Sequence, residues 1–313
     1  MTKNIAISVN NLYKSYGETE VLKGLSFDVP KGTMLALLGP NGAGKTTTVR
    51  ILSTLLSFDT GQVSVNGFDV DTQQAQVRQH IGLTGQSASV DEMLTGRENL
   101  IMMGQLYRLT RASARSRADE LLTQFDLVDA ANRTLKTYSG GMRRRLDLAV
   151  SLIAAPPVIF LDEPTTGLDP RSRMAMWQTI RQLKKDGATI LLTTQYLEEA
   201  DQLADRIILI DNGIIAAEGT ATSLKKMIGN DRLELTFATT IAYSKAQKTL
   251  GDIVVAQTPG EKMLSVLIED VNKDVANTLA LLTAAKIKID TIAIHKPTLD
   301  DVFLTVTEKE RVS

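Results

Sequence analysis

The stretch that decides the fold is Gly39-Pro40-Asn41-Gly42-Ala43-Gly44-Lys45-Thr46, which fits the pattern G-x-x-x-x-G-K-[S/T]. An apolar run, Thr33–Leu38, precedes it, and a helical pattern, Lys45–Leu56, follows it. Glycines let the backbone wrap closely enough for its N–H groups to point at a phosphate, and the N-terminus of the following helix adds its dipole. We therefore expect a P-loop, a phosphate-binding turn between a strand and a helix.

Residues of this loop have distinct expected roles. Lys45 is expected to reach the β- and γ-phosphates of a nucleotide, and the hydroxyl of Thr46 is expected to bind Mg²⁺. The other predicted nucleotide contacts in this segment are Asn41, Gly42, Ala43, Gly44 and Thr47.

A second feature is the apolar run Val158–Leu161, which ends in the acidic pair Asp162-Glu163. A buried strand that carries an aspartate at its carboxyl end is a Walker B element. We expect Asp162 to hold the Mg²⁺ shell and Glu163 to act as general base on the attacking water. Many strands end in acidic residues, so the pattern is weak alone. Together with the P-loop it predicts a nucleotide hydrolase site.

A third motif, Tyr138-Ser139-Gly140-Gly141-Met142, precedes another helical pattern, 94 residues after Lys45 and about 20 before Asp162. Ser139 is a predicted N-cap, and the two glycines permit close backbone approach to a second anion. The three motifs together resemble those of ABC ATPases, whose signature usually has leucine where this chain has Tyr138. The departure leaves the expected phosphate contacts of Ser139 and the glycines in place, because the leucine side chain does not make them.

The resemblance implies roles for other residues. Gln86 matches the glutamine of the family's Q-loop, which contacts Mg²⁺ and its water and senses the membrane partner. Gly167-Leu168-Asp169 matches the D-loop. Tyr16 resembles the aromatic residue that stacks on adenine, with Tyr13 as the alternative. A partly buried aromatic residue at a strand end is the competing interpretation for both tyrosines.

One position departs from the common pattern. The strand Thr189–Thr194 is followed by Gln195, where the family usually has histidine. Glutamine keeps an N–H donor for the γ-phosphate but has no titrating proton, so hydrolysis would rest on Glu163 and the metal. Gln195 and the segment Pro297–Leu304 narrow the resemblance to the daunorubicin-resistance branch. An ordinary helix N-terminus explains the acidic pair in that segment equally well.

That branch implies an ATPase with ATP and Mg²⁺ as cofactors, which powers export of a hydrophobic, drug-like compound. The implied partners are a separate multi-span membrane permease and a second ATPase subunit, identical or related. The implied location is peripheral, at the cytoplasmic face of the cell membrane. The rival hypothesis is an ABC ATPase of translation or DNA repair. Translation-type members carry two cassettes and repair-type members a long coiled coil, whereas this chain has one P-loop and a 94-residue gap before Ser139.

Composition agrees with these expectations. Hydrophobic residues make up 43% and charged residues 23%, which is the balance of an ordinary globular protein. The absence of cysteine excludes disulfides, thiolate metal sites and a cysteine nucleophile. A net charge of −1 offers no global basic field for nucleic acid, so no nucleic-acid partner is expected. The most apolar stretch, Ala149–Leu161, is shorter than the roughly 20 residues of a spanning helix, and the N-terminus lacks the apolar block of a signal peptide.

The order of predicted elements gives the architecture. Residues 1–225 alternate strands and helices, which predicts an α/β P-loop NTPase of ABC type. Its mostly parallel sheet is accompanied by an antiparallel N-terminal part, with strands at Ile5–Val9 and Leu25–Val29, and by a helical subdomain at about 87–157. Residues 230–313 follow the order βαββαβ, which predicts a small ferredoxin-like α+β domain. The run Arg143-Arg144-Arg145 is interpreted as a solvated helix face, with contact to anionic lipid headgroups as the alternative.

Overall fold

The computed structural model describes residues 4–85, 90–229 and 231–312, and the chain divides into two compact units, Met1–Ala221 and Thr222–Ser313. The first unit begins with an antiparallel sheet, as expected. Its strand order is β2 (Thr19–Pro30), β1 (Ile5–Tyr16), β4 (Thr60–Val65) and β5 (Phe68–Asp69). The first two strands extend well beyond their predicted ranges, because irregular register around Asn11, which has a φ of 47°, lets the pairing continue to the turn at Gly17.

The central sheet of this unit holds the functional motifs at its strand ends. Its order is β10 (Ile214–Gly219), β9 (Arg206–Asp211), β3 (Met34–Leu38), β8 (Thr189–Thr194), β7 (Val158–Asp162) and β6 (Ile81–Thr84). Every neighbouring pair is parallel except β9 and β10, a hairpin turned at Asn212-Gly213. The parallel strands are continuous apolar runs, which is typical of strands covered on both faces.

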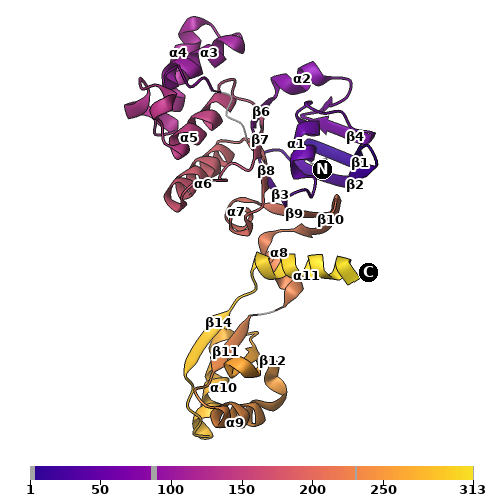
Figure 1. Cartoon of the computed structure of the whole chain (residues 1–313), viewed down its shortest axis with the longest axis vertical. Coiled ribbons are helices and arrows are strands. Elements are labelled where there is room, and N and C mark those ends of the chain that lie inside the picture. The colour runs from indigo at the N-terminus through magenta and orange to yellow at the C-terminus, as the bar shows by residue number, and fades with distance from the viewer. Residues whose placement is uncertain (1–3, 86–89, 230, 313) are drawn as a thin grey trace. The chain divides into compact units, whose positions relative to one another are not determined.

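Two apolar cores cover the two faces of this sheet, and alternate residues of one strand enter different cores. Val158 and Phe160 pack with the antiparallel sheet, with α1 (Lys45–Leu52) and with α2 (Gln74–Gln79). Ile159 and Leu161 pack with the helices that come after α2 in the chain. Figure 1 shows α1 and α5 on opposite sides of the sheet. Those helices are α3 (Gly96–Leu106), α4 (Arg111–Gln124), α5 (Gly140–Ser151) and α6 (Pro170–Lys185), together with α7 (Leu197–Leu203), which packs against β3 and β8.

Local chemistry explains where these helices begin and end. Thr95 and Glu98 form a capping box at the start of α3, each satisfying a backbone N–H of the other's residue. The first helix is shorter than predicted: it ends at Leu52 rather than Leu56, because Thr54 adopts a left-handed φ of 63° that terminates the helix. Short 3₁₀ helices lie at Val128–Ala130 and Leu135–Thr137.

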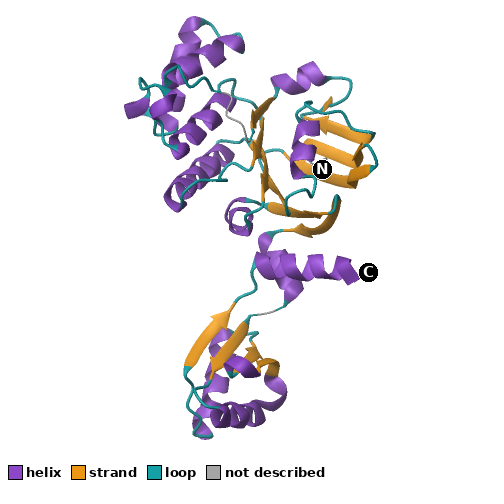
Figure 2. Cartoon of the chain, in the orientation of Figure 1, coloured by secondary structure: helices purple, strands orange, loops and turns teal. Residues whose placement is uncertain are grey.

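The second unit contains a four-stranded antiparallel sheet with the order β12 (Val254–Thr258), β13 (Met263–Leu267), β11 (Arg232–Thr236) and β14 (Thr291–His295). Helices α9 (Thr240–Leu250) and α10 (Val271–Ala284) connect the strands in the order βαββαβ, and Figure 2 shows both helices beside the sheet. The predicted ferredoxin-like topology is therefore present, and the fold class is confirmed. Short 3₁₀ helices lie at Gly251–Ile253 and Pro259–Glu261, and α8 (Ala221–Ile228) and α11 (Leu299–Val312) flank this part of the chain.

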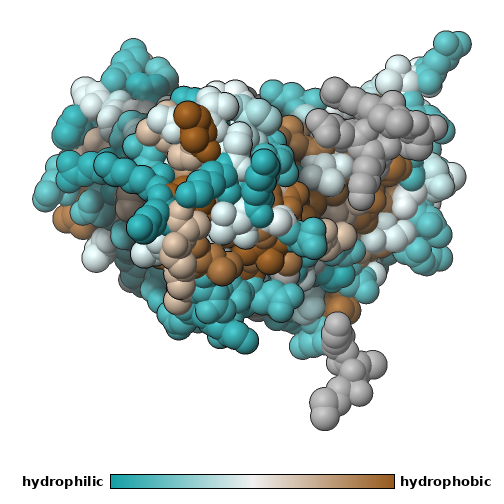
Figure 3. Space-filling view, turned by 90° about the horizontal axis from the view of Figure 1, so that it is seen from below, coloured by the Kyte–Doolittle hydropathy of each residue, from teal (hydrophilic) through white to brown (hydrophobic). Residues whose placement is uncertain are grey.

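The core of the second unit is smaller than the two cores of the first. Leu233 and Leu235 of β11 pack with Leu264, Val266 and residues of both helices. Apolar side chains also remain exposed on this unit, among them Ile292 and Ile294 of the edge strand β14. Figure 3 shows apolar residues interspersed with polar ones on the face seen from below. Among the described residues, no helix combines the length and the apolar composition that crossing a membrane requires.

The limits predicted for the two domains, 1–225 and 230–313, stay a prediction. The helix α8 runs across the predicted limit at residue 225, and the division of the chain into compact units falls after its first residue, Ala221. The predicted helical subdomain, about 87–157, contains α3, α4 and α5.

Candidate nucleotide site

The loop between β3 and α1 has a shape that only glycine permits at two positions. Gly44 has a φ of 104°, and a Cβ there would lie 2.5 Å from Leu22 Cδ2. A Cβ on Gly39 would lie 2.2 Å from the backbone oxygen of Ile210. Gly44 is also the N-cap of α1, and it has no side chain to accept from the first N–H groups of the helix. Those donors are available to an anion, as expected for a phosphate-binding loop.

Lys45 is buried at the start of α1, with 4% of its surface exposed. Its Nζ donates to the backbone oxygens of Gly39 at 2.8 Å and Pro40 at 2.9 Å. An ammonium has three N–H donors, so these bonds fix its place over the loop and leave one donor for a ligand. Burial lowers the pKa of the Lys45 ammonium from its ordinary value, while the neighbouring Glu163 and Asp162 carboxylates act in the opposite direction.

Asp162 ends β7 beside this loop, and its side chain is held by residues of strand β8 and helix α1. Its Oδ1 accepts from the hydroxyl of Thr193 at 2.5 Å and from that of Thr46 at 3.2 Å. A carboxylate and a hydroxyl this close are hard oxygen donors of the kind that Mg²⁺ takes in nucleotide sites. The donor set therefore fits a magnesium ion between Thr46 and Asp162.

Glu163 follows at once, and its backbone is strained. It has a φ of 50°, unusual for a residue other than glycine, and only 8% of its surface is exposed. Its N–H donates to both the backbone oxygen and the hydroxyl of Thr193, each at 3.1 Å. The hydroxyl of Thr166 donates to Glu163 Oε2 at 3.3 Å. These contacts hold the Glu163 carboxylate beside that of Asp162.

The prediction that the arginines of α5 form a solvated helix face is wrong for Arg144. Its side chain is only 14% exposed, because the guanidinium turns inward from α5 onto the loop after β7. It donates to the backbone oxygens of Asp162, Glu163 and Pro164, and to that of Gly85. Burial lowers the pKa of Arg144, and the charges of Asp147, Asp162, Glu199 and Glu163 oppose that effect.

The signature segment begins α5 as the sequence predicts. Ser139 is the N-cap, and its Oγ accepts from Met142 N at 3.3 Å. Tyr138, the departure from the family's leucine, is buried, and its hydroxyl donates to Ala130 O at 2.8 Å. Its side chain thus packs inside the helical part and leaves the start of α5 open. A Cβ on Gly141 would lie 2.6 Å from Ser172 Oγ, so α6 also requires glycine there.

The remaining predicted site residues differ in how far they are exposed. Gln195 is half-buried directly after β8, Asn41 is exposed in the P-loop, and Thr47 is half-buried in α1. Tyr16 at the end of β1 is 47% exposed and Tyr13 is 41% exposed, but the hydroxyl end of Tyr13 lies against Gly24 of β2, whereas Tyr16 is at the strand end. The remaining predicted residue, Gln86, lies outside the described residues.

Sequence reasoning missed several residues that hold this site. Thr193, Thr166 and Arg144 each contact Asp162 or Glu163. Thr166 is three residues from Glu163, whereas only the fold brings Thr193 and Arg144 to the site. Glu199 was missed as well: its Oε1 accepts from Thr165 Oγ1 at 2.7 Å and from Trp177 Nε1 at 3.0 Å. Burial raises the pKa of the Glu199 carboxyl, and hydrogen bonds from neighbouring groups oppose that rise. In the sequence, the only sign of these residues is a hydroxyl or charged side chain within an otherwise apolar segment.

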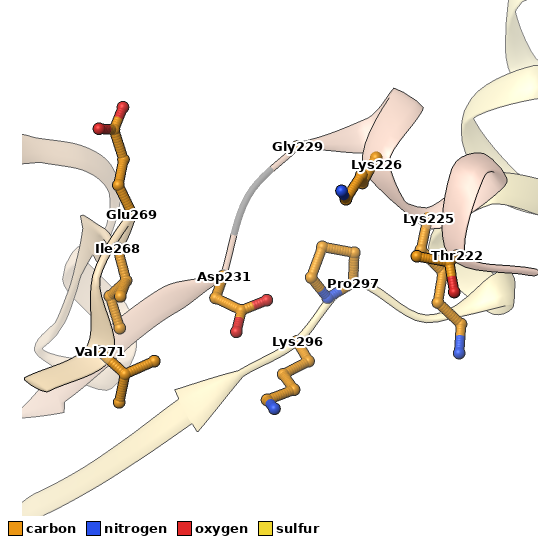
Figure 4. A pocket seen from close by; sticks show the side chains of 10 residues that line it. All are labelled: Thr222, Lys225, Lys226, Gly229, Asp231, Ile268, Glu269, Val271, Lys296 and Pro297. Atoms are coloured by element: carbon orange, nitrogen blue, oxygen red, sulfur yellow. The ribbon is translucent and has the colours of Figure 1, made fainter.

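A separate hollow lies in the second unit, and it lacks the features of a nucleotide site. Its charged lining residues are Lys225, Lys226, Lys296, Asp231 and Glu269, and the others are small or apolar. Figure 4 shows these side chains coming from the end of α8, the residue before β11, the segment after β13 and the segment after β14. Its lining has no P-loop and no pair of adjacent carboxylates, so the motifs assign the nucleotide to the first unit.

The fold and the site define a P-loop ATPase of the ATP-binding cassette type. The family model described as "ABC transporter" matches residues 22–166, and the model described as "ATP-binding protein DrrA1-3-like, C-terminal domain" matches residues 219–307. The chain belongs to the family of ABC transporter ATP-binding proteins.

Two curated relatives cover nearly the whole chain. A daunorubicin resistance ATP-binding protein of Streptomyces coeruleorubidus is 49% identical over 306 residues, covering 98% of this chain and 97% of the relative. A linearmycin resistance ATP-binding protein of Bacillus subtilis is 36% identical over 306 residues, covering 96% and 98%. Among solved structures, a dimeric ATP-binding cassette in a post-hydrolysis state, bound to ADP and Pi, matches with a TM-score of 0.62 and 27% identity, covering 68% of this chain and 98% of that one.

The P-loop geometry yields a prediction. Gly44→Ala should destabilise the protein by roughly 2–4 kcal/mol, from left-handed strain plus the clash with Leu22, and should abolish measurable ATP binding. Gly187→Ala is the matched control, because Gly187 has a similar φ of 97° and open space where its Cβ would lie. It should cost only about 1 kcal/mol and preserve binding. Denaturant unfolding and fluorescent-nucleotide titration measure both quantities, and equal effects of the two substitutions would contradict the assigned geometry.

Proposed function

We propose that this chain binds and hydrolyses Mg·ATP at the P-loop and powers export of a hydrophobic, drug- or antibiotic-like compound through a separate membrane permease. The observation that carries the proposal is the buried pair Asp162-Glu163, held beside Lys45 at the mouth of the P-loop. Burying two adjacent carboxylates costs folding free energy unless they meet a cation or a reacting group. The burial of this pair therefore indicates a functional site.

Nucleotide binding follows from the loop. The N–H groups at the start of α1 and the ammonium of Lys45 face the place where phosphates would lie, and both attract negative charge. Asn41, Gly42 and Ala43 would line the phosphates, Thr47 would contribute from the first turn of α1, and Tyr16 would stack on the adenine.

The metal would be held by Thr46 and Asp162, with Gln86 as a further proposed ligand. When bound, Mg²⁺ supplies positive charge next to the β- and γ-phosphates. Asp162 is prepared for this role because Thr193 already fixes its Oδ1.

Glu163 would take the proton from the water that attacks the γ-phosphate. The Glu163 N–H donates to Thr193 Oγ1, and the Thr166 hydroxyl donates to the Glu163 carboxylate, so the carboxylate needs little reorientation at the moment of reaction. Gln195 would donate an N–H to the γ-phosphate from the end of β8.

The signature would complete the site of a second subunit. In one chain, α1, which follows the P-loop, and α5, which begins at the signature, lie on opposite sides of the sheet (Figure 1), and this separation favours a nucleotide shared between two subunits. A head-to-tail pair would set Ser139, Gly140 and Gly141 of one subunit against the nucleotide of the other. N–H groups at the start of α5 would then stabilise charge on the γ-phosphate. The dimeric state of the related cassette supports this arrangement.

Export through a partner is supported by the relatives. Two proteins similar to this chain over nearly its full length are named for resistance to daunorubicin and to linearmycin, which are different compounds. We infer that the compound is selected by the permease and that this subunit supplies the energy. It would then work at the cytoplasmic face of the membrane, where ATP is available.

The general-base assignment is tested by Glu163→Gln. Because the metal ligands and the P-loop survive, ATP binding should persist while turnover falls by roughly 10²–10⁴-fold. Glu198→Gln serves as the matched control, since Glu198 is an exposed glutamate on α7 whose ion pair with Arg173 lies at the surface. It should retain turnover within about two-fold, as expected for an exposed pair. Phosphate release and nucleotide titration provide the measurements, and near-normal turnover by Glu163→Gln would place the base elsewhere.

The partner assignment is tested in membranes. The tagged full-length chain, crosslinked in its own cells and purified from their membranes, should carry a multi-span membrane protein. As a control, membranes are isolated from cells that were not crosslinked and are stripped of peripheral proteins before the crosslinker is added. The yield of this membrane protein should then fall. Mass spectrometry identifies the partner, and recovery of ribosomal proteins or DNA-repair factors instead would overturn the export proposal.

A further inference from the structure

The side chain of Arg144 links segments that are distant in sequence. It projects from α5, one turn after the signature glycines, and reaches the loop that carries Glu163 as well as Gly85, the residue that follows β6. Arg144 is separated from Pro164 by 20 residues and from Gly85 by 59 residues. A single guanidinium thus connects the signature helix with two strand ends of the nucleotide site.

Most of the N–H groups of the Arg144 guanidinium donate hydrogen bonds to backbone oxygens. Nε donates to Pro164 O at 2.9 Å, and Nη1 donates to Gly85 O at 2.7 Å. Nη2 donates to Glu163 O at 2.8 Å and to Asp162 O at 3.2 Å. Four of the five N–H directions of the guanidinium therefore have backbone acceptors. A lysine ammonium has three donors and no planar fork, so it cannot reproduce this set.

These acceptors define the backbone at the catalytic carboxylate. The oxygens of Asp162 and Glu163 belong to the two peptide groups on either side of the Glu163 Cα. Fixing both peptide planes fixes the φ and ψ of Glu163, which lie in a sparsely populated region with φ at 50°. The direction in which the Cα–Cβ bond of Glu163 leaves the backbone follows from those two angles, and the Thr166 hydroxyl then holds the carboxylate. The strained conformation persists only where surrounding contacts determine it.

We propose that Arg144 is a positioning residue for ATP hydrolysis: from the signature helix it holds the peptide planes around Glu163 and the end of β6 in the arrangement that turnover requires. The inference rests on the proposed role of Glu163 as general base. It assigns to Arg144 no contact with nucleotide, so its loss affects the chemical step more than the binding of ATP.

The neighbouring arginines provide the comparison. Arg145 lies on the same helix, and its Nη1 donates to Phe125 O at 3.0 Å, to Asp126 O at 3.3 Å and to Asp126 Oδ2 at 3.2 Å. These partners directly follow α4, away from Glu163. Substituting Arg145 therefore removes a comparable number of hydrogen bonds without touching the loop after β7.

The experiment compares Arg144→Gln, Arg144→Lys and Arg145→Gln in the full-length chain. For Arg144→Gln we expect kcat to fall roughly 10–100-fold while the Kd for ATP stays within about three-fold of wild type, because the reacting geometry is disturbed and the P-loop is not. Arg144→Lys should fall between Arg144→Gln and wild type, since it restores part of the donor set. Arg145→Gln should keep kcat within about three-fold, and its unfolding midpoint serves as the stability control.

Three results would overturn the inference. One is a kcat of Arg144→Gln equal to that of Arg145→Gln. A second is a loss of ATP affinity that matches the loss of kcat. The third, decisive if Arg144→Gln does not fold, is wild-type kcat in Arg144→Lys. Glu163→Gln, measured in the same assay, separates this failure from that of the base assignment. If Glu163→Gln is inactive while Arg144→Gln is active, only the positioning role is wrong; if Glu163→Gln is active, the base assignment is wrong.

Discussion

The adjacent carboxylates of Asp162 and Glu163 lie more than nine-tenths buried, and the rest of the nucleotide site is arranged around keeping them there. Removing two like charges from water is costly unless donors and cations surround them. The donors come from Thr46, Thr193 and Thr166, and the cations are Lys45 and Arg144. A magnesium ion held by Asp162 would complete the compensation. The same arrangement that stabilises the pair also directs it toward the phosphates.

The strand order of the central sheet brings these groups together. In the order β3-β8-β7-β6, adjacent parallel strands end at one edge, so the P-loop, Gln195, Asp162 and Gly85 leave the sheet side by side. Because both faces of the sheet are covered by apolar cores, this edge is where polar groups can emerge from the interior. The signature helix stands on the other side of the sheet from α1, and Arg144 is the side chain that returns from it to the strand ends.

Much of this could be predicted from the sequence, because the decisive signals are local. The P-loop and the strand before Asp162 are contiguous motifs, and the βαββαβ order of the second unit follows from alternating patterns. The contacts of Thr193 and Arg144 are not local: their partners lie 31 and up to 59 residues away. Three arginines in a row on a helix are usually solvated, and only tertiary structure distinguishes Arg144 from Arg145. The predicted end of α1, Leu56, is four residues too late, because the helix is terminated by a left-handed turn at Thr54 and no glycine in the sequence indicates that turn.

The central claim is that each ATP is hydrolysed between the P-loop of one subunit and the signature of another. Mixing two variants, Lys45→Ala and Ser139→Arg, tests it most directly, because each variant should be inactive alone. In a mixed dimer one site combines both defects, while the other pairs an intact P-loop with an intact signature. The account predicts that equimolar mixing restores hydrolysis to at most about a quarter of the wild-type rate, since half of the dimers are mixed and each has one intact site. No recovery on mixing, at protein concentrations where the wild type is fully active, would contradict it.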